Sequence, residues 1–509
     1  MALEVNTYIC IPVLVVLYLL TKTVLHKLRG LPPAPFPVLP VIGHLHLLKK
    51  PLHQTLAKLS ERHGKVLLFR FGSRRVLHVS SPLAAEECFS KNDIVFANRP
   101  GFLCGKYFGY NYTSLSWAPY GEHWQNLRRI SATDLLSSTR LDSLSYIRLE
   151  EIQSLTHRLF LASNKNPNEI LNLRSELFGF VFIVMTRMMG GKMHNGLGIE
   201  KSDIAKRFHD IVADTAQVNA QSGMADMLPI WRWFLGGRLE KRYTSVQKRR
   251  DDFMQEWINE IRADVLRNEE EKKTFLRVLL SLQDSDPEYY TDEMIKSLSQ
   301  ALLHGGISTS VETMEWAMSL LLNSPHVLIK AQAEIDSVVG CVRLVNEADL
   351  SKLPYLHCII KETLRMHPAA PLLLPHESSK ECSLGGYRIP HGTMLLMNVW
   401  ALQNDPNTWD CPEIFKPERF EIKDNIAKPK EGLTMMPFGS GRRRCPGENL
   451  AMRIMGLGLA SLIQCFEWKR VSDELVDMTE SAGFSAPRAQ PLMVKYLTRS
   501  TIASHIIHI

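Results

Sequence analysis

The chain has 509 residues, of which 45% are hydrophobic and 22% are charged. This composition predicts an ordered globular protein with a large buried core and excludes an intrinsically disordered chain. The formal net charge of +7 suits an anionic membrane surface or an acidic protein partner, whereas the lack of a Lys/Arg stripe interleaved with aromatic residues argues against a nucleic-acid partner.

Residues 1–29 are predicted to form an N-terminal membrane anchor. The stretch 3–25 is mostly apolar and reaches the length of about 20 residues that spans a bilayer if Lys22 extends to the interface. The charges of Lys22, Lys27 and Arg29 follow the apolar run, which favours an anchor over a cleaved signal peptide. Because positive residues stay in the cytoplasm, we expect one transmembrane helix and a cytosolic body.

Residues 30–40 form a proline-rich hinge. Proline fixes φ and favours an extended backbone, so this segment is either a stiff spacer that holds a domain away from the membrane or a simple linker. In both interpretations, a separate catalytic body follows the hinge and comprises residues 41–509.

The body is predicted to be mainly α, one large helical domain with small β-sheets. Apolar runs at residues 66–71 and 76–79 around Gly72-Ser73 indicate a β-hairpin, and short strands are expected at residues 387–389 and 394–397. The longest helix, 292–323, is apolar around most of its circumference and should cross the centre of the body, with Thr291 as its N-cap. Helical periodicity also predicts helices over residues 82–90, 121–133, 150–163, 243–268, 325–339, 355–367 and 449–466.

One of the nine cysteines, Cys445, stands in an unusual context. No CxxC pair occurs, which argues against a zinc ribbon or a thioredoxin-like site. Cys445 follows a loop rich in glycine and arginine and precedes a helix, and positive charge and a helix N-terminus both favour a thiolate. Phe438 can pack beside the sulfur, and Arg443 is placed to pair with a carboxylate. A buried, inert cysteine is the alternative, but it explains neither the arginine run nor the glycines.

The pattern F-x-x-G-x-R-x-C-x-G is filled by Phe438, Gly441, Arg443, Cys445 and Gly447. This segment resembles the heme-binding loop of a cytochrome P450. The resemblance implies the cytochrome P450 fold, heme b as cofactor and Cys445 as the iron ligand. Thiolate ligation donates electron density that favours O–O cleavage.

Further motifs extend the resemblance. In that family, an E-x-x-R pair and a later arginine form a buried ion network behind the heme, whereas an isolated Glu–Arg pair on a helix is usually a solvated surface pair. The matching residues are Glu362, Arg365 and Arg419. The family's contacts to the heme propionates imply the same role here for Trp124, Arg128 and His376.

The segment 304–310, His-Gly-Gly-Ile-Ser-Thr-Ser, resembles the family's oxygen-activating element A/G-G-x-D/E-T-T/S. Gly305 and Gly306 would leave room above the iron, and Thr309 matches the threonine that hydrogen-bonds oxygen. Ser308 stands at the acidic position, where a hydroxyl cannot replace a carboxyl as a proton reservoir. Either hydroxyls and ordered water suffice for hydroxylation, or the reaction is a non-standard oxidation such as dehydrogenation, phenol coupling or oxidative ring closure.

The resemblance also places walls of a substrate pocket. The leucines among them imply an apolar substrate, and His304 either binds a polar substrate group or is a paired core histidine. An aromatic loop around Trp231 either dips into the membrane interface or packs in the core. The pocket residues are Leu115, His304, Gly305, Leu372, Leu373, Leu374 and Phe484.

Phrases such as Phe-Ala-Asn-Arg-Pro at residues 96–100 are similar to plant microsomal members, especially the isoflavone 2'-hydroxylase-like group. This similarity implies an endoplasmic reticulum enzyme that oxidises an apolar or aromatic plant specialised metabolite, a phenolic or an alkaloid, with O2. Electrons would come from NADPH through a flavoprotein reductase docked near the basic loop 442–444. The alternatives are an oxygen-independent isomerase or dehydratase, and a non-catalytic heme protein that binds a ligand.

Overall fold

The computed structural model describes residues 21, 26, 28–167, 169–191, 201–265, 274–421, 431–481, 483 and 485–506. Most of the predicted membrane anchor, residues 1–29, therefore lies outside the described residues. Within those ranges, no helix combines the length and the apolar character that crossing a bilayer requires. The transmembrane helix stays a prediction.

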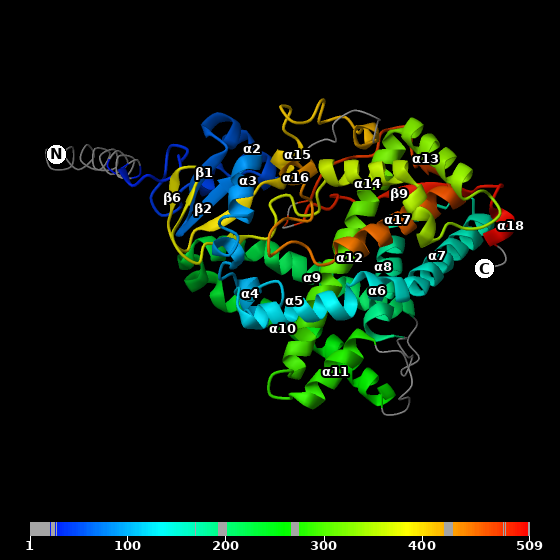
Figure 1. Ribbon diagram of the computed structural model, residues 1–509, viewed down its shortest axis with the longest axis horizontal. Coiled ribbons are helices and arrows are strands. Elements are labelled where there is room, and N and C mark those ends of the chain that lie inside the picture. The colour runs from blue at the N-terminus through cyan, green and yellow to red at the C-terminus, as the bar shows by residue number, and fades with distance from the viewer. Residues whose placement is uncertain are drawn as a thin grey trace, which may run out of the picture.

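The described chain is mainly helical, as the sequence predicts, with the helices packed around a central one (Figure 1). The helices are α2 (Leu52–His63), α3 (Pro82–Phe89), α4 (Leu103–Tyr107), α5 (Glu122–Ile130), α6 (Ser138–Ser143), α7 (Ser145–Lys165), α8 (Leu173–Gly190), α9 (Lys201–Met227), α10 (Pro229–Val265), α11 (Phe275–Ser285), α12 (Asp292–Asn323), α13 (Pro325–Val338), α14 (Pro354–Met366), α15 (Val399–Gln403), α16 (Glu431–Thr434), α17 (Glu448–Cys465) and α18 (Ala503–Ile506).

Three small sheets accompany the helices. The first has the order β1-β2-β7-β4, in which β1 and β2 form the predicted antiparallel hairpin and β7 runs parallel to β2. It lies at the N-terminal end of the body, far from α7 and α18 (Figure 1). The strands are β1 (Val66–Phe71), β2 (Arg74–Val79), β3 (Leu171–Asn172), β4 (His376–Glu377), β5 (Cys382–Leu384), β6 (Tyr387–Ile389), β7 (Met394–Met397), β8 (Phe466–Arg470) and β9 (Met493–Thr498).

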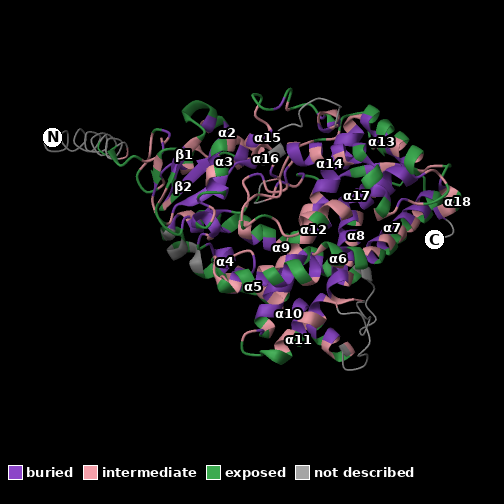
Figure 2. Cartoon of the chain, viewed as in Figure 1, coloured by how far each residue is buried: buried purple, intermediate pink, exposed green. Residues whose placement is uncertain are grey.

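Helix α12 runs through the middle of the body with the bounds that the sequence predicts. Thr291 caps it, since its hydroxyl oxygen accepts a hydrogen bond from the backbone N–H of Met294 at 3.3 Å. Pro325 opens the next helix, α13. Figure 2 shows buried residues along α14 and α17, and α12 packs against both of these helices. An apolar helix with neighbours on most sides provides a rigid wall for a central site.

The proline-rich segment 30–40 is hydrogen-bonded to the body. The backbone N–H of Leu68 donates to the carbonyl of Pro33 at 2.9 Å, and that of Arg388 donates to Gly30 at 2.8 Å. Leu68 lies in β1 and Arg388 in β6, so the segment is held by two different sheets. These contacts fix its direction relative to the body, and its role as a spacer from a membrane stays a prediction.

Candidate active site

The loop before α17 brings Cys445 to the N-terminal end of that helix. The backbone N–H of Cys445 donates to the carbonyl of Phe438 at 2.9 Å, which closes the loop. Gly441 has φ +68°, and a Cβ at this position would collide with the carboxylate of Asp93. Glycine is therefore required for this path of the loop.

Burial raises the pKa of the Cys445 thiol above its usual value, because a thiolate is poorly solvated inside the protein. The backbone N–H of Gly447 and the charge of Arg128 act in the opposite direction. These two contributions agree with the expectation that local charges favour the thiolate, but burial outweighs them. A metal cation bound to the sulfur would reverse that balance.

Arginines from distant segments meet beside this loop. Arg443 donates to the carbonyl of Ala97 at 2.7 Å, and Arg99 donates to that of Leu374 at 2.8 Å. The Nδ1 atom of His376 lies 2.7 Å from the carbonyl oxygen of Phe96. Among the described residues, no carboxylate pairs with Arg443, whose partners are backbone carbonyls.

Three arginines form this cationic cluster, namely Arg99, Arg128 and Arg443, and the neutral imidazole of His376 lies beside them. Burial, with a neighbouring arginine second, lowers the pKa of Arg99 to about 9 and that of Arg443 to about 10. Burial is also the main cause that lowers the pKa values of Arg128 and His376. None of the four forms an ion pair with a carboxylate among the residues that the structure describes. Half-buried cations without a carboxylate partner favour binding of an anionic ligand.

Trp124 lies under this cluster but does not offer its N–H to a ligand. Its indole N–H donates to the carbonyl of Leu115 at 3.1 Å, and the Arg443 guanidinium lies 4.4 Å from its ring centroid. The cation–π contact supports the planar guanidinium from one side. Trp124 thus supports Arg443, and its contact with a heme propionate stays a prediction. Arg99 was not among the sequence-based candidates, although it lies in the quoted Phe-Ala-Asn-Arg-Pro segment.

Glu362, Arg365 and Arg419 form one buried ion network. Arg365 donates to both carboxylate oxygens of Glu362, at 2.8 and 3.0 Å, and Arg419 donates to one of them at 2.9 Å. The side chains of Glu362 and Arg365 are fully buried. Arg365 also donates to the carbonyls of Gln403 and Pro412, at 2.8 and 2.7 Å. The network therefore ties α14 to the end of α15 and to the loop around Pro412, and it is not the solvated surface pair of the alternative interpretation.

On α12, the two glycines have different surroundings. A Cβ on Gly305 would meet nothing within 4 Å, so this position faces open space. A Cβ on Gly306 would lie 2.7 Å from Cε of Met185 in α8. The expectation that both glycines leave room above the iron is thus wrong for Gly306, which permits close packing of two helices. The hydroxyl of Thr309 donates to the carbonyl of Gly305 at 2.7 Å.

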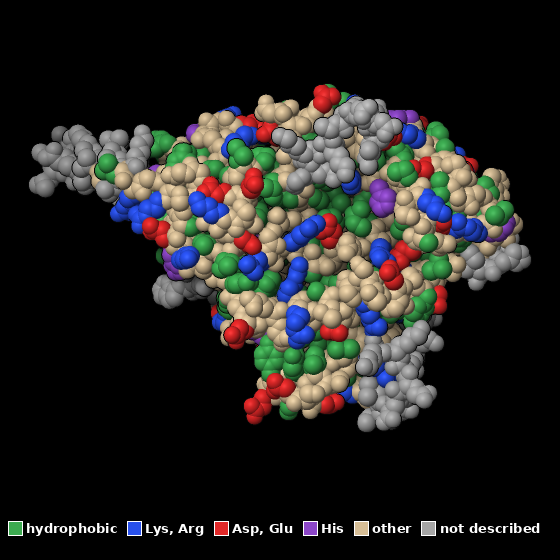
Figure 3. All heavy atoms as spheres, in the orientation of Figure 1, with side chains coloured by type: hydrophobic (Ala, Val, Ile, Leu, Met, Phe, Trp, Pro, Cys, Tyr) green, Lys and Arg blue, Asp and Glu red, His purple; other side chains and the backbone are tan. Residues whose placement is uncertain are grey.

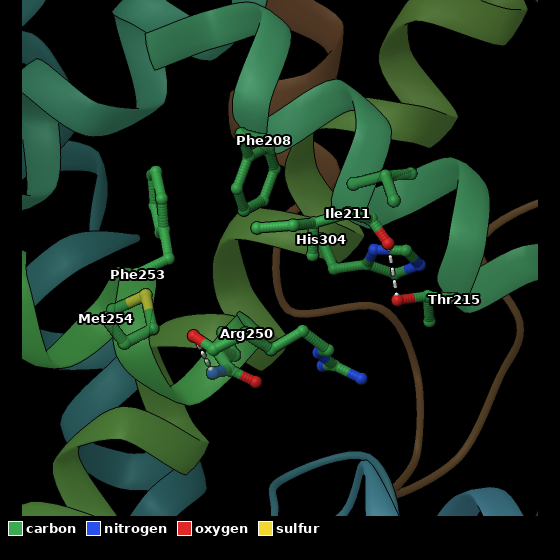
Figure 4. Close-up of a pocket in the computed structure, with 9 residues that line it drawn as sticks. Phe208, Ile211, Thr215, Arg250, Phe253, Met254 and His304 are labelled. Atoms are coloured by element: carbon green, nitrogen blue, oxygen red, sulfur yellow. Dashed lines mark hydrogen bonds between the residues drawn. The ribbon is translucent and has the colours of Figure 1, made fainter. Parts of the chain in front are cut away.

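His304 lines a small cavity between α9, α10 and α12, with a volume of about 10 Å³, room for about one water molecule. Burial first, and Arg250 second, lower the pKa of His304 to about 4, so the imidazole is neutral at pH 7. Figure 4 shows it beside Thr215, with Phe208 and Phe253 on the other side of the cavity. No hydrogen bond joins His304 to another residue within the described ranges. This disfavours the paired core histidine.

The other predicted pocket residues differ in their exposure to solvent. Leu115 is buried, Leu372 and Leu373 are half-buried, and Leu374 is 37% exposed. Leu373 adopts φ +53°, an uncommon conformation for a branched residue. Phe484 lies outside the described residues. Residues of α9, such as Phe208, were not predicted, because the sequence analysis did not recognise that helix.

Comparison with known proteins agrees with this geometry. A family model for Cytochrome P450 matches residues 32–494. The chain belongs to the cytochrome P450 family. It is 47% identical over 464 residues to cytochrome P450 81Q32 of Catharanthus roseus, covering 91% of each chain. It is 46% identical to an isoflavone 2'-hydroxylase of Glycyrrhiza echinata, covering 94% of this chain and 93% of that one.

A third relative is a (+)-piperitol/(+)-sesamin synthase of Sesamum radiatum, 45% identical with coverage of 92% of this chain and 90% of the relative. As a member of this family, with relatives named as hydroxylases, the cytochrome P450 described here is a monooxygenase, an oxidoreductase that works with heme iron. Its residues fit that cofactor. Gly305 leaves open space beside α12, the cationic cluster lacks anions, and Cys445 stands next to Arg128.

We predict that Glu362→Ala produces a protein that does not retain heme. Removing the carboxylate leaves Arg365 buried and unpaired, which costs roughly 3–5 kcal/mol of folding free energy and loosens the segments it holds. The measurement is heme content per purified polypeptide. Glu381→Ala is the matched control, because it breaks an exposed Glu–Arg pair, with Arg388, and should leave heme content unchanged. Normal heme content in Glu362→Ala would contradict the prediction.

Proposed function

We propose that this cytochrome P450 holds heme b through an iron–thiolate bond from Cys445 and oxidises an apolar or aromatic plant specialised metabolite. In this proposal, Arg99, Arg128, His376 and Arg443 receive the heme propionates. The observation that carries it is the half-buried cationic cluster, which has no carboxylate partner among the described residues and lies beside Cys445, the cysteine that a glycine-dependent loop brings to a helix N-terminus. When bound, a thiolate-ligated heme supplies activation of dioxygen.

The chain's own residues would then have three tasks. The cationic cluster would orient the cofactor and neutralise its carboxylates. The apolar side chains of the predicted substrate pocket, next to the open face of α12, would exclude water and hold the substrate. Thr309 presents a hydroxyl oxygen whose proton is already given to Gly305, so it can accept a hydrogen bond from a neighbouring donor. Ser308 offers a further hydroxyl but no carboxyl.

The choice between hydroxylation and oxidative ring closure or coupling is part of this proposal. The relatives include an isoflavone 2'-hydroxylase and a (+)-piperitol/(+)-sesamin synthase. Their sequence identities to this chain are nearly the same, so identity alone does not choose between the two kinds of reaction. We propose substrates of the same broad class, plant phenolics or alkaloids. The reaction would require O2 and electrons from NADPH through a flavoprotein reductase at the endoplasmic reticulum membrane.

The test is a reductase-coupled reaction of the heme-loaded enzyme with a panel of plant phenolics and alkaloids under isotopically labelled O2. We expect a product that forms only when both NADPH and O2 are present. A mass increase from one labelled oxygen atom indicates hydroxylation, and a loss of hydrogen without added label indicates ring closure or coupling. Product formation without NADPH or O2 would contradict the proposal and favour an isomerase or dehydratase.

We further propose that the reductase docks at the Cys445 side of the body, through Arg442 and Arg444. Both guanidinium groups are exposed, although each lies beside a carboxylate, Asp93 and Glu448 respectively. On the face drawn in Figure 3, Lys and Arg side chains are likewise interspersed with Asp and Glu. Such a surface steers an acidic partner by a few local contacts rather than by one large basic patch.

If so, the rate of heme reduction by the reductase should fall as the ionic strength rises from about 0.05 to about 0.5 M, because salt screens exposed charges. Arg442→Ala and Arg444→Ala should each lower the rate at low salt. Arg388→Ala serves as the control, because Arg388 is exposed and lies in β6, outside the loop that carries Arg442 and Arg444. A rate that is independent of salt in rapid-mixing experiments would refute docking through these charges.

A further inference from the structure

Helix α12 is covered on all sides except along one stripe. Between residues 301 and 322 every side chain is buried apart from a single set of positions, spaced by one to four residues along one face of the helix. These are Ala301, His304, Gly305, Ser308, Thr309 and Glu312, whereas the half-buried Gly306 lies off this face and packs against Met185 of α8. The ten residues after Glu312 are all buried. Glu312 is thus the last position of the open face and carries its one carboxyl group.

The carboxyl group of Glu312 is poorly satisfied. The residue as a whole is half-buried, but its Oε2 atom is fully buried and has no hydrogen-bond partner among the described residues. Its Oε1 atom accepts a hydrogen bond from the Ser485 hydroxyl at 3.2 Å. Burial raises the pKa of Glu312 to about 8, and the nearby Glu315 raises it too, while Ser485 and Arg174 lower it. At neutral pH the carboxyl therefore keeps its proton.

A structural role does not explain this group. Glu315, one turn further on, shows how a structural acid is held here: its two oxygens accept from Arg174 at 2.8 Å and from the Leu492 backbone N–H at 2.7 Å. Arg174 is thereby engaged with Glu315, and no ion pair involves Glu312 in the described part of the chain. A buried, half-satisfied acid lowers stability. Such groups cluster at functional sites.

The position of Glu312 complements that of Ser308. Ser308 precedes Glu312 by four residues, so the two side chains are neighbours on one face, with Cβ atoms about 6 Å apart. The hydroxyl oxygen of Ser308 is likewise buried without a hydrogen-bond partner among the described residues. One bridging water satisfies both groups at this spacing. Thr309, beside Ser308, keeps free lone pairs on its hydroxyl oxygen.

We propose that Glu312 is the proton-holding acid of the oxygen-binding side of α12 and replaces the carboxyl group that Ser308 lacks. The O–H bond of Glu312 breaks as its proton moves to a water, and that water gives one of its own protons to the Ser308 hydroxyl, which would release its original proton to the dioxygen being reduced, leaving a carboxylate on Glu312. Thr309, whose hydroxyl proton is donated to Gly305, accepts a hydrogen bond in this relay and does not carry the proton. The Glu312 carboxylate regains a solvent proton past the half-buried Ser485. No electrons move in these steps. The inference rests on the proposed oxygen-dependent function, because only that chemistry consumes protons here.

The first test reads the proton itself and requires no turnover. In infrared difference spectra of the heme-loaded wild type against Glu312→Gln, we expect a carboxylic acid carbonyl band at neutral pH that shifts in D2O and fades as the pH rises through about 8. Glu293→Gln, which changes an exposed glutamate of the same helix, should give only a carboxylate difference. Absence of the acid band at neutral pH overturns the proposal.

Thermal unfolding gives an independent reading of the same group. Folding raises the pKa of this carboxyl group from 4.5 to about 8, so the folded state loses stability relative to the unfolded state as the pH rises from 4.5 to about 8. Over that pH interval, the midpoint temperature of unfolding of Glu312→Gln should therefore rise relative to that of the wild type. The midpoint temperature of Glu293→Gln should not. A constant difference between wild type and Glu312→Gln would contradict a protonated Glu312.

The second test follows the destination of the proton. In the reductase-coupled reaction, Glu312→Gln should divert at least about ten times more of the NADPH-derived electrons into hydrogen peroxide per product formed, a typical size for loss of a general acid. Adding Ser308→Asp to Glu312→Gln should restore coupling, and Glu293→Gln should behave as wild type. Unchanged coupling in Glu312→Gln overturns the inference. If the wild type itself forms no NADPH-dependent product, the proposed function fails instead, and the infrared result is unaffected.

Discussion

The site around Cys445 depends on positive charge that is half-buried without matching negative charge from the described part of the chain. Arg99 and Arg443 have their pKa values lowered to about 9 and about 10 chiefly because they are removed from water. Backbone carbonyls satisfy their N–H groups but do not neutralise them. A ligand that brings carboxylates offsets this cost, so binding of the cofactor and stability of the fold are linked. The same cations lie near a sulfur whose pKa burial raises, and an iron cation would correct that too.

The sequence predicted the parts of this site that short motifs encode. Cys445, Arg443, Glu362 and Arg365 lie in segments whose local pattern carries their role, and helix α12 has the predicted bounds because Thr291 caps it. The family was also predicted, and the comparisons confirm it. Contacts between residues far apart in the chain could not be predicted, since no local pattern states which distant backbone group a side chain will contact.

Particular residues show this limit. Trp124 donates to the carbonyl of Leu115 and stacks under Arg443, and Gly306 packs against Met185, contacts that no local pattern states. Arg99 was missed as a member of the cationic cluster, because only folding brings it beside Arg443. Helices α8 and α9 were missed for different reasons. Helix α8 is apolar nearly all round, so it has little periodicity to read, and α9 has a weak apolar stripe.

The same limit explains why Ser308 first suggested a non-standard oxidation. Read by motif, the chain lacks an acid beside Thr309, but the fold leaves Glu312 on the same open face one turn later. With an acid there, proton delivery for ordinary hydroxylation needs no carboxyl at Ser308. Which oxidation occurs therefore depends on which residue of this face holds the proton.

The bond between Cys445 and iron is the claim on which all of these roles rest. Its most direct measurement is the absorption spectrum of the reduced, carbon monoxide-bound protein, for wild type and for Cys445→Ala. The account predicts a band near the position that thiolate ligation gives, about 450 nm, in the wild type only. A wild type without that band, or a Cys445→Ala protein that keeps it, would contradict the account.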